Sequence, residues 1–594
     1  MPSPPLLNLT AVTLPQLRLW PRLQQYIPIL QWLPQYRRED WVGDVMAGII
    51  VAIMLVPQGM AYALLAGLPP QVGLYASIVP LMLYAALGSS RALAVGPVAM
   101  VSLLVASGVG DLAPPGSREY VAIALTLALM VGIIQTLMGV LRAGFLVNFL
   151  SHAVIVGFTN AAALVIAASQ LKHLLGVKIP RSDNFFETLH FLVQAVPQVN
   201  GIVLLLGLGS MATILGFSRL LPQGLERLGV PPGWRVPLSR SGPLVVVVVT
   251  TACVAIAHLD TTWGVPVVGS IPQGLPPLSQ PPWSVDLLRQ LLPTALTLSF
   301  VGFMESVAVA KALASKRRQR IDPNQELIGL GMANLGAAFT GGYPVAGGFG
   351  RSVVNFTAGA NTGLASLITA VLVALVVVFF TPWFAALPQA ALAAVILVAV
   401  MNLLDWHTLG RLWRVEPSDA LALVITFFAV LFVGIEQGIV VGFGASVLFL
   451  LWRTSRPHFA EVGRLGDSEH FRNVARHAVA TCRQVLAVRI DESLYFANTR
   501  QLEDYLLTAI AHHPEATALL LIWSAVNHID ASALETLETL ISGLREAGVQ
   551  VYLSDVKGPV MDQLERARFV DFLGRDRIFL SAHQAMQTLE HAIS

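Results

Sequence analysis

A glutamate, Glu305, lies in an apolar stretch, residues 293–314, that is long enough to cross a lipid bilayer. A carboxylate is costly in the hydrocarbon core. It persists there when it faces a cavity or a partner, and it usually marks an ion or proton pathway. The position of Glu305 therefore indicates a transport site rather than an inert membrane anchor. The alternative is a structural salt bridge, for which Arg351 is the candidate partner.

Two other apolar segments, 92–108 and 345–358, are short and interrupted by glycine and proline. Each reads as an extended stretch followed by a half helix, with Pro97 expected in the first turn of the earlier one. Paired short segments at matching positions of two halves indicate an inverted-repeat transporter site. Helix N-termini present unpaired N–H groups and a partial positive charge, so two that face each other predict an anion site.

Side chains near these half helices fit the same chemistry. Arg351 falls on the first turn of the later half helix, where it would complete an anion site or neutralise it when empty. Gln58 follows Pro57 in the first apolar stretch, and it is either a helix-packing residue or part of the site. A single glycine or proline interruption is equally compatible with a packing kink. Two at matching positions, one of them with an arginine, favour a binding site.

The elements that must position these residues are apolar helices. Of the 594 residues, 55% are hydrophobic and 12% are charged, against roughly 25% charged in soluble domains. Apolar runs dominate from about Asp44 to Arg453, and an ordinary soluble composition follows. We expect a cytoplasmic N-terminal segment (1–43), a transmembrane transport domain (44–455) and a cytoplasmic α/β domain (456–594).

Fourteen spans fit the apolar runs. They are 44–66, 71–88, 92–108, 119–141, 145–170, 201–219, 243–258, 292–314, 325–340, 345–358, 362–380, 386–404, 418–434 and 436–452. Residues 184–198 are expected to lie at the membrane interface instead.

Lysine and arginine predict the orientation, because they concentrate in cytoplasmic loops. With the N-terminus inside, the inner loops hold most of them, including Arg219, Arg227, Arg235 and Arg240. Both termini are therefore expected in the cytoplasm, and the membrane is expected to be the cytoplasmic (inner) membrane. The outer residues Lys172, Lys178 and Arg181 are an exception that the rule does not explain.

The C-terminal part alternates strand-like and helical patterns. Strands are predicted at 485–490, 518–524 and 549–554, and a helix at 531–548 that ends at Gly548. No nucleotide-binding glycine loop or catalytic constellation is evident, so neither an enzyme nor a cofactor is expected. The two cysteines, Cys253 and Cys482, fall in different predicted domains and indicate neither a disulfide framework nor a metal site.

Long motifs at these positions resemble the sulfate permease (SulP) family, the bacterial and plant branch of the solute carrier 26 anion transporters. They are PQGMAYALLAGLPPQVGLYAS (57–77), FMESVAVAKALASKRRQRIDPNQELIGLGMANL (303–335) and YPVAGGFGRSVVN (343–355). The tail resembles the STAS domain (sulfate transporter and anti-sigma-factor antagonist) through LYFANTRQLEDYL (494–506) and WSAVNHIDASALETL (523–537). The resemblance implies a seven-plus-seven inverted repeat, a core domain that moves against a gate domain, and a homodimer.

The resemblance also assigns site residues. The family's anion pocket maps to Gln58, Tyr62, Val98, Ala99, Gly348, Phe349, Gly350 and Arg351. Glu305 matches an acidic position tied to proton coupling in plant relatives and to sodium in a bicarbonate-transporting branch. One turn later, Val309 replaces the threonine of the sodium-dependent branch and offers no oxygen ligand, which favours protons.

Three positions depart from the common family pattern, because Ala346, Gly348 and Gly350 stand where Thr, Ser and Ser are frequent. Backbone N–H groups must then carry more of the anion binding. In the tail, Asp530 is expected to cap a helix, while Ser532 matches the loop in which anti-sigma-factor antagonists are phosphorylated.

The expected function is secondary active transport, with sulfate and a proton taken up together by an elevator-like motion. One alternative is transport of bicarbonate or another anion by sodium symport or by exchange. A second is a membrane signalling scaffold whose output is the STAS domain, with a cytoplasmic partner. A scaffold would not require Gln58, Glu305 and Arg351 together.

Overall fold

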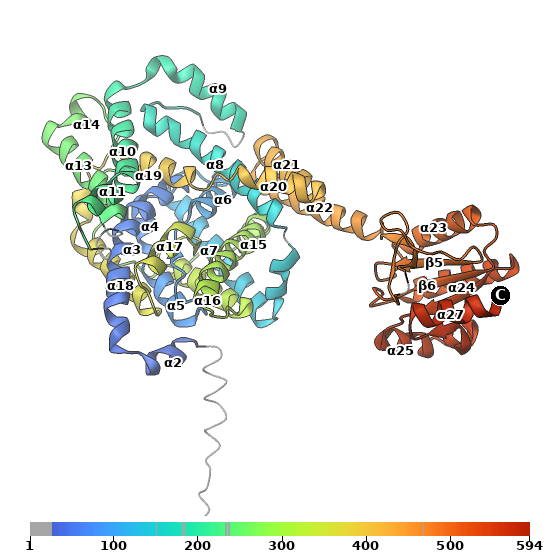
Figure 1. Cartoon of the computed structure of the whole chain (residues 1–594). Helices are drawn as coiled ribbons and strands as arrows, with labels where there is room; N and C mark the ends of the chain where they lie inside the picture. The colour runs from blue at the N-terminus through green and yellow to red at the C-terminus, as the bar shows by residue number, and fades with distance from the viewer. Residues whose placement is uncertain are drawn as a thin grey trace, which may run out of the picture. The chain divides into compact units, whose positions relative to one another are not determined.

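The chain folds into two compact units, Met1–Ser446 and Val447–Ser594 (Figure 1). The computed structural model describes residues 27–149, 151–180, 185–231, 235, 238–466 and 468–593. Most of the expected N-terminal segment (1–26), Arg181 and residue 184 lie outside the described residues. The division between the units falls inside helix α22 (Ile435–Thr454). The domain boundary expected at 455/456 lies just beyond that helix and stays a prediction.

The first unit is helical. Over the described residues of both units, seven helices are long and apolar enough to cross a membrane, and the last of them, α22, runs across the division between the units. They are α3 (Arg38–Leu65), the α4–α5 pair (Pro70–Tyr75 and Val79–Leu87), α7 (Arg118–Val140), α8 (His152–Leu175), α10 (Gly201–Arg219), α15 (Val285–Lys316) and α22. Shorter apolar helices are α6 (Ala99–Gly110), α13 (Gly242–Ala257), α18 (Leu364–Phe379), α19 (Gln389–Met401) and α21 (Pro417–Phe432). With α16 (Pro323–Phe339) and α17 (Phe349–Thr357), each of the fourteen predicted segments overlaps a helix or helix pair. How many cross the membrane stays a prediction.

Helix ends follow local sequence signals. Ser117, Asn200 and Ser284 are N-caps whose side-chain oxygens accept hydrogen bonds from the first turns of α7, α10 and α15. At the other end of α8, Gly176 adopts the left-handed conformation with φ 69°, which glycine reaches without steric cost.

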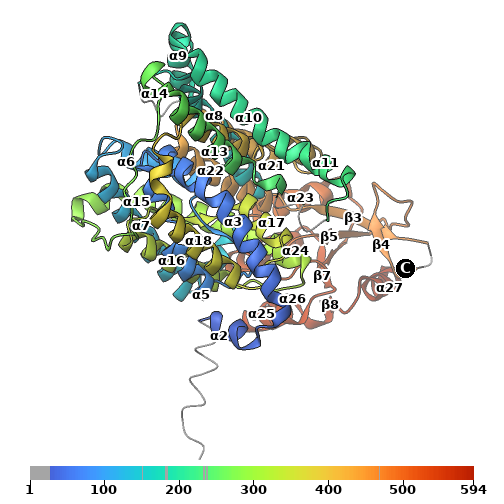
Figure 2. The same cartoon turned by 90° about the vertical axis from the view of Figure 1, so that its left-hand side faces the viewer.

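These helices form two groups. In the first helix group, α16 packs against α5 and α7, α15 against α6 and α7, and α17 and α18 against α3. In the second helix group, α8 packs against α19 and α21, and α10 against α13 and α19. Contacts of α3 with α13 and α19 join the groups. Helices α9 (Phe185–Ala195) and α14 (Leu259–Thr262) lie at one end of the unit, and α2 (Ile29–Trp32) at the opposite end (Figures 1 and 2).

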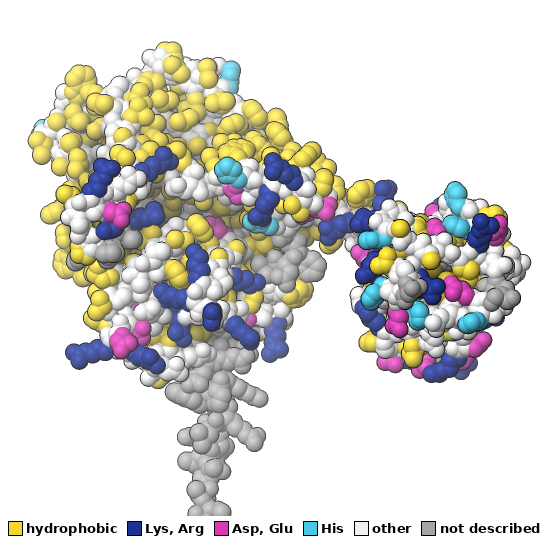
Figure 3. Space-filling model, in the orientation of Figure 1, with side chains coloured by type: hydrophobic (Ala, Val, Ile, Leu, Met, Phe, Trp, Pro, Cys, Tyr) yellow, Lys and Arg dark blue, Asp and Glu magenta, His cyan; other side chains and the backbone are white. Residues whose placement is uncertain are grey.

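The surface of the first unit suits a bilayer. Hydrophobic side chains cover a broad area of it, and lysine and arginine gather outside that area (Figure 3). Leu205, Ile256 and Val440 are among the large apolar side chains that are exposed. Such extensive exposed apolar surface is unusual for a soluble monomer.

The second unit is an α/β domain with a six-stranded sheet of order β4-β3-β5-β6-β7-β8. Strands β5 (Val485–Ile490), β6 (Ala518–Ile522), β7 (Gln550–Ser554) and β8 (Ile578–Phe579) run parallel, while β3 (Phe459–Arg464) is antiparallel to β4 (Phe471–Asn473) and to β5. The helices are α23 (Thr499–His512), α24 (Ala531–Glu546), α25 (Gly558–Arg566), α26 (Phe569–Leu573) and α27 (Ala582–Ile593). The three predicted strands and the predicted helix are confirmed.

Asp530 caps α24 as expected, because its Oδ1 accepts a hydrogen bond from the Ala533 N–H at 2.8 Å. Its Oδ2 accepts another from the Phe496 N–H at 2.9 Å, so this carboxylate also ties down the segment before α23. Ser532 is exposed on the first turn of α24, and its phosphorylation stays a prediction.

Candidate functional site

Two extended segments cross inside the first unit, and each leads into a half helix. Strand β1 (Val95–Gly96) pairs antiparallel with β2 (Ala346–Gly347). Helix α6 follows β1, and α17 follows β2. Ser352 on α17 accepts a hydrogen bond from the Ala94 N–H at 2.9 Å, across 258 positions of sequence. The expected pair of extended stretches and half helices is therefore present, and the two are joined directly.

Buried polar side chains hold this crossing in place. Asn334 on α16 accepts from the Val345 N–H at 2.8 Å and donates to the Val345 carbonyl at 3.1 Å. Ser306 on α15 accepts from the Gly347 N–H at 2.8 Å. Non-helical backbone at membrane depth requires such internal partners, so the extended segments are satisfied by the first helix group itself.

The N-termini of both half helices open into one cavity of about 150 Å³. Val98 and Gly348 are the N-cap residues, and no described side chain caps either helix. The first N–H groups of a helix lack intrahelical partners, so both ends contribute a partial positive charge. Pro97 precedes the cap rather than lying in the first turn, and its carbonyl accepts a hydrogen bond from Arg351. The prediction for Pro97 was therefore wrong by two positions.

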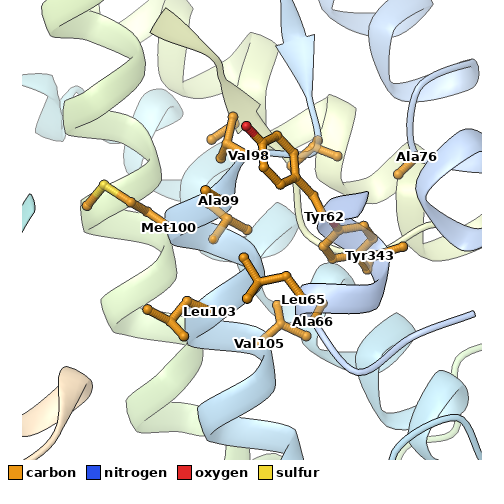
Figure 4. Close-up of a cluster of buried hydrophobic side chains, with 14 of the residues drawn as sticks. Tyr62, Leu65, Ala66, Ala76, Val98, Ala99, Met100, Leu103, Val105 and Tyr343 are labelled. Atoms are coloured by element: carbon orange, nitrogen blue, oxygen red, sulfur yellow. The ribbon is translucent and has the colours of Figure 1, made fainter. Parts of the chain in front are cut away.

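The cavity brings together every residue that the sequence predicted for the site. These are Gln58, Tyr62, Val98, Ala99, Glu305, Gly348, Phe349, Gly350 and Arg351. Its other lining residues are Met54, Met100, Arg240, Ala399, Asn402 and Leu403. Figure 4 shows Tyr62 of α3 in one buried cluster with Val98 and Ala99 at the start of α6.

The two charged residues of the cavity interior have free hydrogen-bonding capacity. Arg351 is 3% exposed, and its Nη1 donates to the Pro97 carbonyl at 2.7 Å. Its Nε and Nη2 are buried without a hydrogen-bond partner, as is Oε2 of Glu305. The structure contains no ion pair within 4.0 Å between these two described residues. Arg351 is thus bound to backbone rather than to Glu305, contrary to the salt-bridge alternative.

Gly348 makes room for the Arg351 guanidinium. A Cβ atom at position 348 would lie 2.8 Å from both Cζ and Nη2 of Arg351, which is closer than real contacts allow. A Cβ at Gly350 would meet nothing within 4 Å. The two glycines, which replace hydroxyl residues common in the family, therefore differ in their consequences for the site.

The cavity lies between the two helix groups. Helices α3, α6, α15 and α17 line it from the first group, and α19 with the residues just after it lines it from the second. Arg240, just before α13, also lines it. Sequence reasoning placed Arg240 in an inner loop and missed its position here, because no motif marks it. Asn402 was missed as well, and its side chain donates to the Val398 carbonyl at 3.0 Å.

Comparison with known proteins identifies the family of this chain. The model of the sulfate permease family matches residues 41–426, and that of the STAS domain matches residues 478–585. The chain belongs to the sulfate permease family. A probable sulfate transporter 4.2 of Arabidopsis thaliana is 39% identical over 579 residues, covering 96% of this chain and 84% of the relative. The probable sulfate transporter MT1781 of Mycobacterium tuberculosis is 34% identical over 555 residues, covering 93% of this chain and 96% of the relative.

Solved structures of the wider family have the same fold. The overall structure of SLC26A9 matches with a TM-score of 0.89 and 25% identity, covering 100% of this chain and 98% of that one. The transmembrane domain of a cyanobacterial bicarbonate transporter, BicA, matches in fold with a TM-score of 0.58 and 24% identity, covering 69% of this chain and 98% of that one. This family member is therefore a multi-pass, mostly helical membrane transporter with a C-terminal STAS domain. Its relatives are transporters and not enzymes, in agreement with the sequence. Within the described ranges, no group of three or more His, Cys, Asp or Glu side chains could hold a metal ion.

Proposed function

We propose that this permease takes up sulfate together with protons by secondary active transport. The observation that carries the proposal is the cavity where two half-helix N-termini meet an arginine and a glutamate whose buried polar atoms have no partner. Buried polar groups without partners are rare in native proteins, and here they converge on one space. The names of the relatives, which are sulfate transporters, support the choice of anion.

In this proposal the anion binds to the helix ends and to Arg351. Nε and Nη2 of Arg351 supply two charge-assisted hydrogen bonds, which are stronger than neutral ones. Gln58 and Tyr62 of α3 also line the pocket. A cavity of about 150 Å³ is well below the roughly 300–1,000 Å³ of sites for organic ligands, which favours a small inorganic anion.

Glu305 is the proposed proton carrier. Its carboxylate lies in the same cavity as the anion site, so protonation there removes a negative charge that would repel the substrate. Co-transport of protons also lowers the net charge moved, and each charge is worth about 2.3 kcal/mol per 100 mV of membrane potential. Binding of proton and anion would favour each other, as linkage requires.

The proposed motion is elevator-like. The first helix group would act as the core domain, because it carries both half helices, Glu305 and Arg351. The second group would act as the gate, because it closes the other side of the cavity. The antiparallel pairing of β1 with β2 supports an inverted seven-plus-seven repeat of fourteen spans. The proposal includes a homodimer in the cytoplasmic (inner) membrane, with both termini in the cytoplasm.

Transport by the purified full-length protein in liposomes tests this function. Uptake of labelled sulfate would be measured with an inward pH gradient, with an inward sodium gradient, and with neither. We expect labelled sulfate to accumulate with the pH gradient alone. Unlabelled sulfate should inhibit this uptake more strongly than bicarbonate or chloride does. Accumulation that requires sodium would replace protons as the coupling ion. A preference for bicarbonate over sulfate would overturn the substrate assignment.

A further inference from the structure

Arg240 is a third charged residue of the cavity, besides Glu305 and Arg351. It lies between α11 (Leu221–Arg227) and α13, and its side chain is exposed. No described residue forms an ion pair with it within 4.0 Å. Its neighbour Arg235, by contrast, is paired with Glu226 at 3.0 Å. Arg240 therefore lines the cavity with a charge that no described ion pair compensates, whereas Arg235 is paired within its own segment.

The lining residues are graded by depth. Tyr62, Val98 and Arg351 are buried, whereas Arg240, Phe349 and Asn402 are exposed and mark the mouth of the cavity. Arg240 lies in a helical turn (238–240) of the connection between α10 and α13, which the positive-inside rule assigns to the cytoplasm. An anion that moves between the deep site and the cytoplasm through this mouth would pass close to Arg240.

Arg240 also lies on the other side of the boundary between the two helix groups, which move against each other in the proposed mechanism. Glu305 and Arg351 belong to the first helix group, while α13, which follows Arg240, packs in the second. Charged side chains from both sides of this boundary therefore line the cavity. With Glu305 protonated, Arg351 and Arg240 together present two positive charges, which balance one divalent anion. With Arg351 alone the cavity would balance a monovalent anion.

We propose that Arg240 is a specificity-determining residue that makes the cavity prefer divalent over monovalent oxyanions. This inference rests on the proposed function, because it assumes that the cavity is the anion site. The electrostatic energy of an anion near a fixed charge is proportional to the anion's own charge. Removal of Arg240 therefore lowers the logarithm of the binding affinity twice as much for a divalent anion as for a monovalent anion of similar size.

The test is equilibrium competition on the full-length protein in detergent, with labelled sulfate displaced by unlabelled sulfate or by nitrate. For R240Q we expect sulfate affinity to fall about tenfold, as for a charge at a solvated mouth, and nitrate affinity to fall only about threefold. R240K keeps the charge and should keep the sulfate-to-nitrate ratio of wild type. The matched control is R227Q, which removes an exposed arginine from the same predicted side but outside the cavity.

Each outcome decides the inference. An unchanged sulfate-to-nitrate ratio in R240Q would overturn it, whether the two affinities fell equally or not at all. A ratio in R240K as low as in R240Q would show that guanidinium geometry, not charge, is responsible, and would also overturn it. If R240Q is not monodisperse, R240M takes its place in the same comparison, because it also removes the charge, and an unchanged sulfate-to-nitrate ratio in R240M would overturn the inference. Wild-type protein that fails to bind sulfate would refute the proposed function itself, which separates the two failures.

Discussion

Replacement of Arg351 by alanine removes the one full positive charge in the deep part of the cavity. The side chain has three nitrogen groups, of which Nη1 is bound to the Pro97 carbonyl, while Nε and Nη2 remain for substrate. A hydrogen bond to a charged group contributes about 1.5–3 kcal/mol. Two such bonds contribute about 3–6 kcal/mol, which corresponds to roughly 10²- to 10⁴-fold in affinity.

The same substitution has a separate effect on stability. It leaves the buried Pro97 carbonyl without its donor, which costs about 1–3 kcal/mol. We therefore expect Arg351→Ala to lower the melting temperature while it abolishes measurable sulfate binding. Arg351→Lys would retain the charge but lose the planar fork of donors, so its affinity should fall between those of wild type and alanine.

Sulfate binding to purified, monodisperse protein is the assay, with thermal unfolding recorded on the same samples. Arg227→Ala, an exposed position outside the cavity, controls for the general loss of a positive charge. Unchanged sulfate affinity in a folded Arg351→Ala protein would refute the reasoning. It would mean that backbone N–H groups alone hold the anion and that Arg351 only joins the two half helices.

Three further predictions concern the same structure. Glu305→Gln imitates the protonated carboxyl, so it should bind sulfate and exchange it but not accumulate it under an inward pH gradient; accumulation in liposomes would exclude Glu305 as the coupling residue. Gly348→Ser should displace the Arg351 guanidinium and weaken sulfate binding about tenfold or more. Gly350→Ser, where the space is open, should change sulfate affinity by less than about threefold. Equal effects of the two substitutions in a binding titration would contradict the steric argument. Deletion of residues 458–594 cuts the chain between α22 and β3. Because every residue lining the cavity precedes the cut, sulfate affinity should stay within about threefold of wild type, while transport or expression is impaired. Loss of binding by the monodisperse truncated protein would refute this division of labour.

The sequence predicted the local features of the fold well because they depend on local chemistry. The apolar length of 201–219 defines α10, and glycine and proline interruptions define both half helices. The nine predicted site residues meet because the N-termini of α6 and α17 converge on one cavity beside α3 and α15. What the sequence lacked was the relation between distant loops and this place. Arg240 looks like an ordinary positive-inside residue until the second helix group is packed against the first.

Hydrogen-bond partners were also beyond the sequence. Charge alone suggests that Arg351 pairs with Glu305, but the guanidinium donates to the Pro97 carbonyl and lies 2.8 Å from where a Cβ at position 348 would be. Such geometry follows from packing that is built only when the two halves meet.

The crossing of β1 and β2 has a consequence for synthesis of the protein. Ala94 leaves the ribosome 258 residues before Ser352, its hydrogen-bond partner. At roughly 5–20 residues per second, this gap lasts about 13–50 s. During that time the extended backbone around β1 lacks its partners on β2 and α17 at bilayer depth, where each unsatisfied group costs several kcal/mol. A nascent chain arrested before residue 340 should therefore keep this segment in a water-accessible or chaperone-bound state, and only translation of β2 and α17 lets the first half of the transporter settle in the membrane.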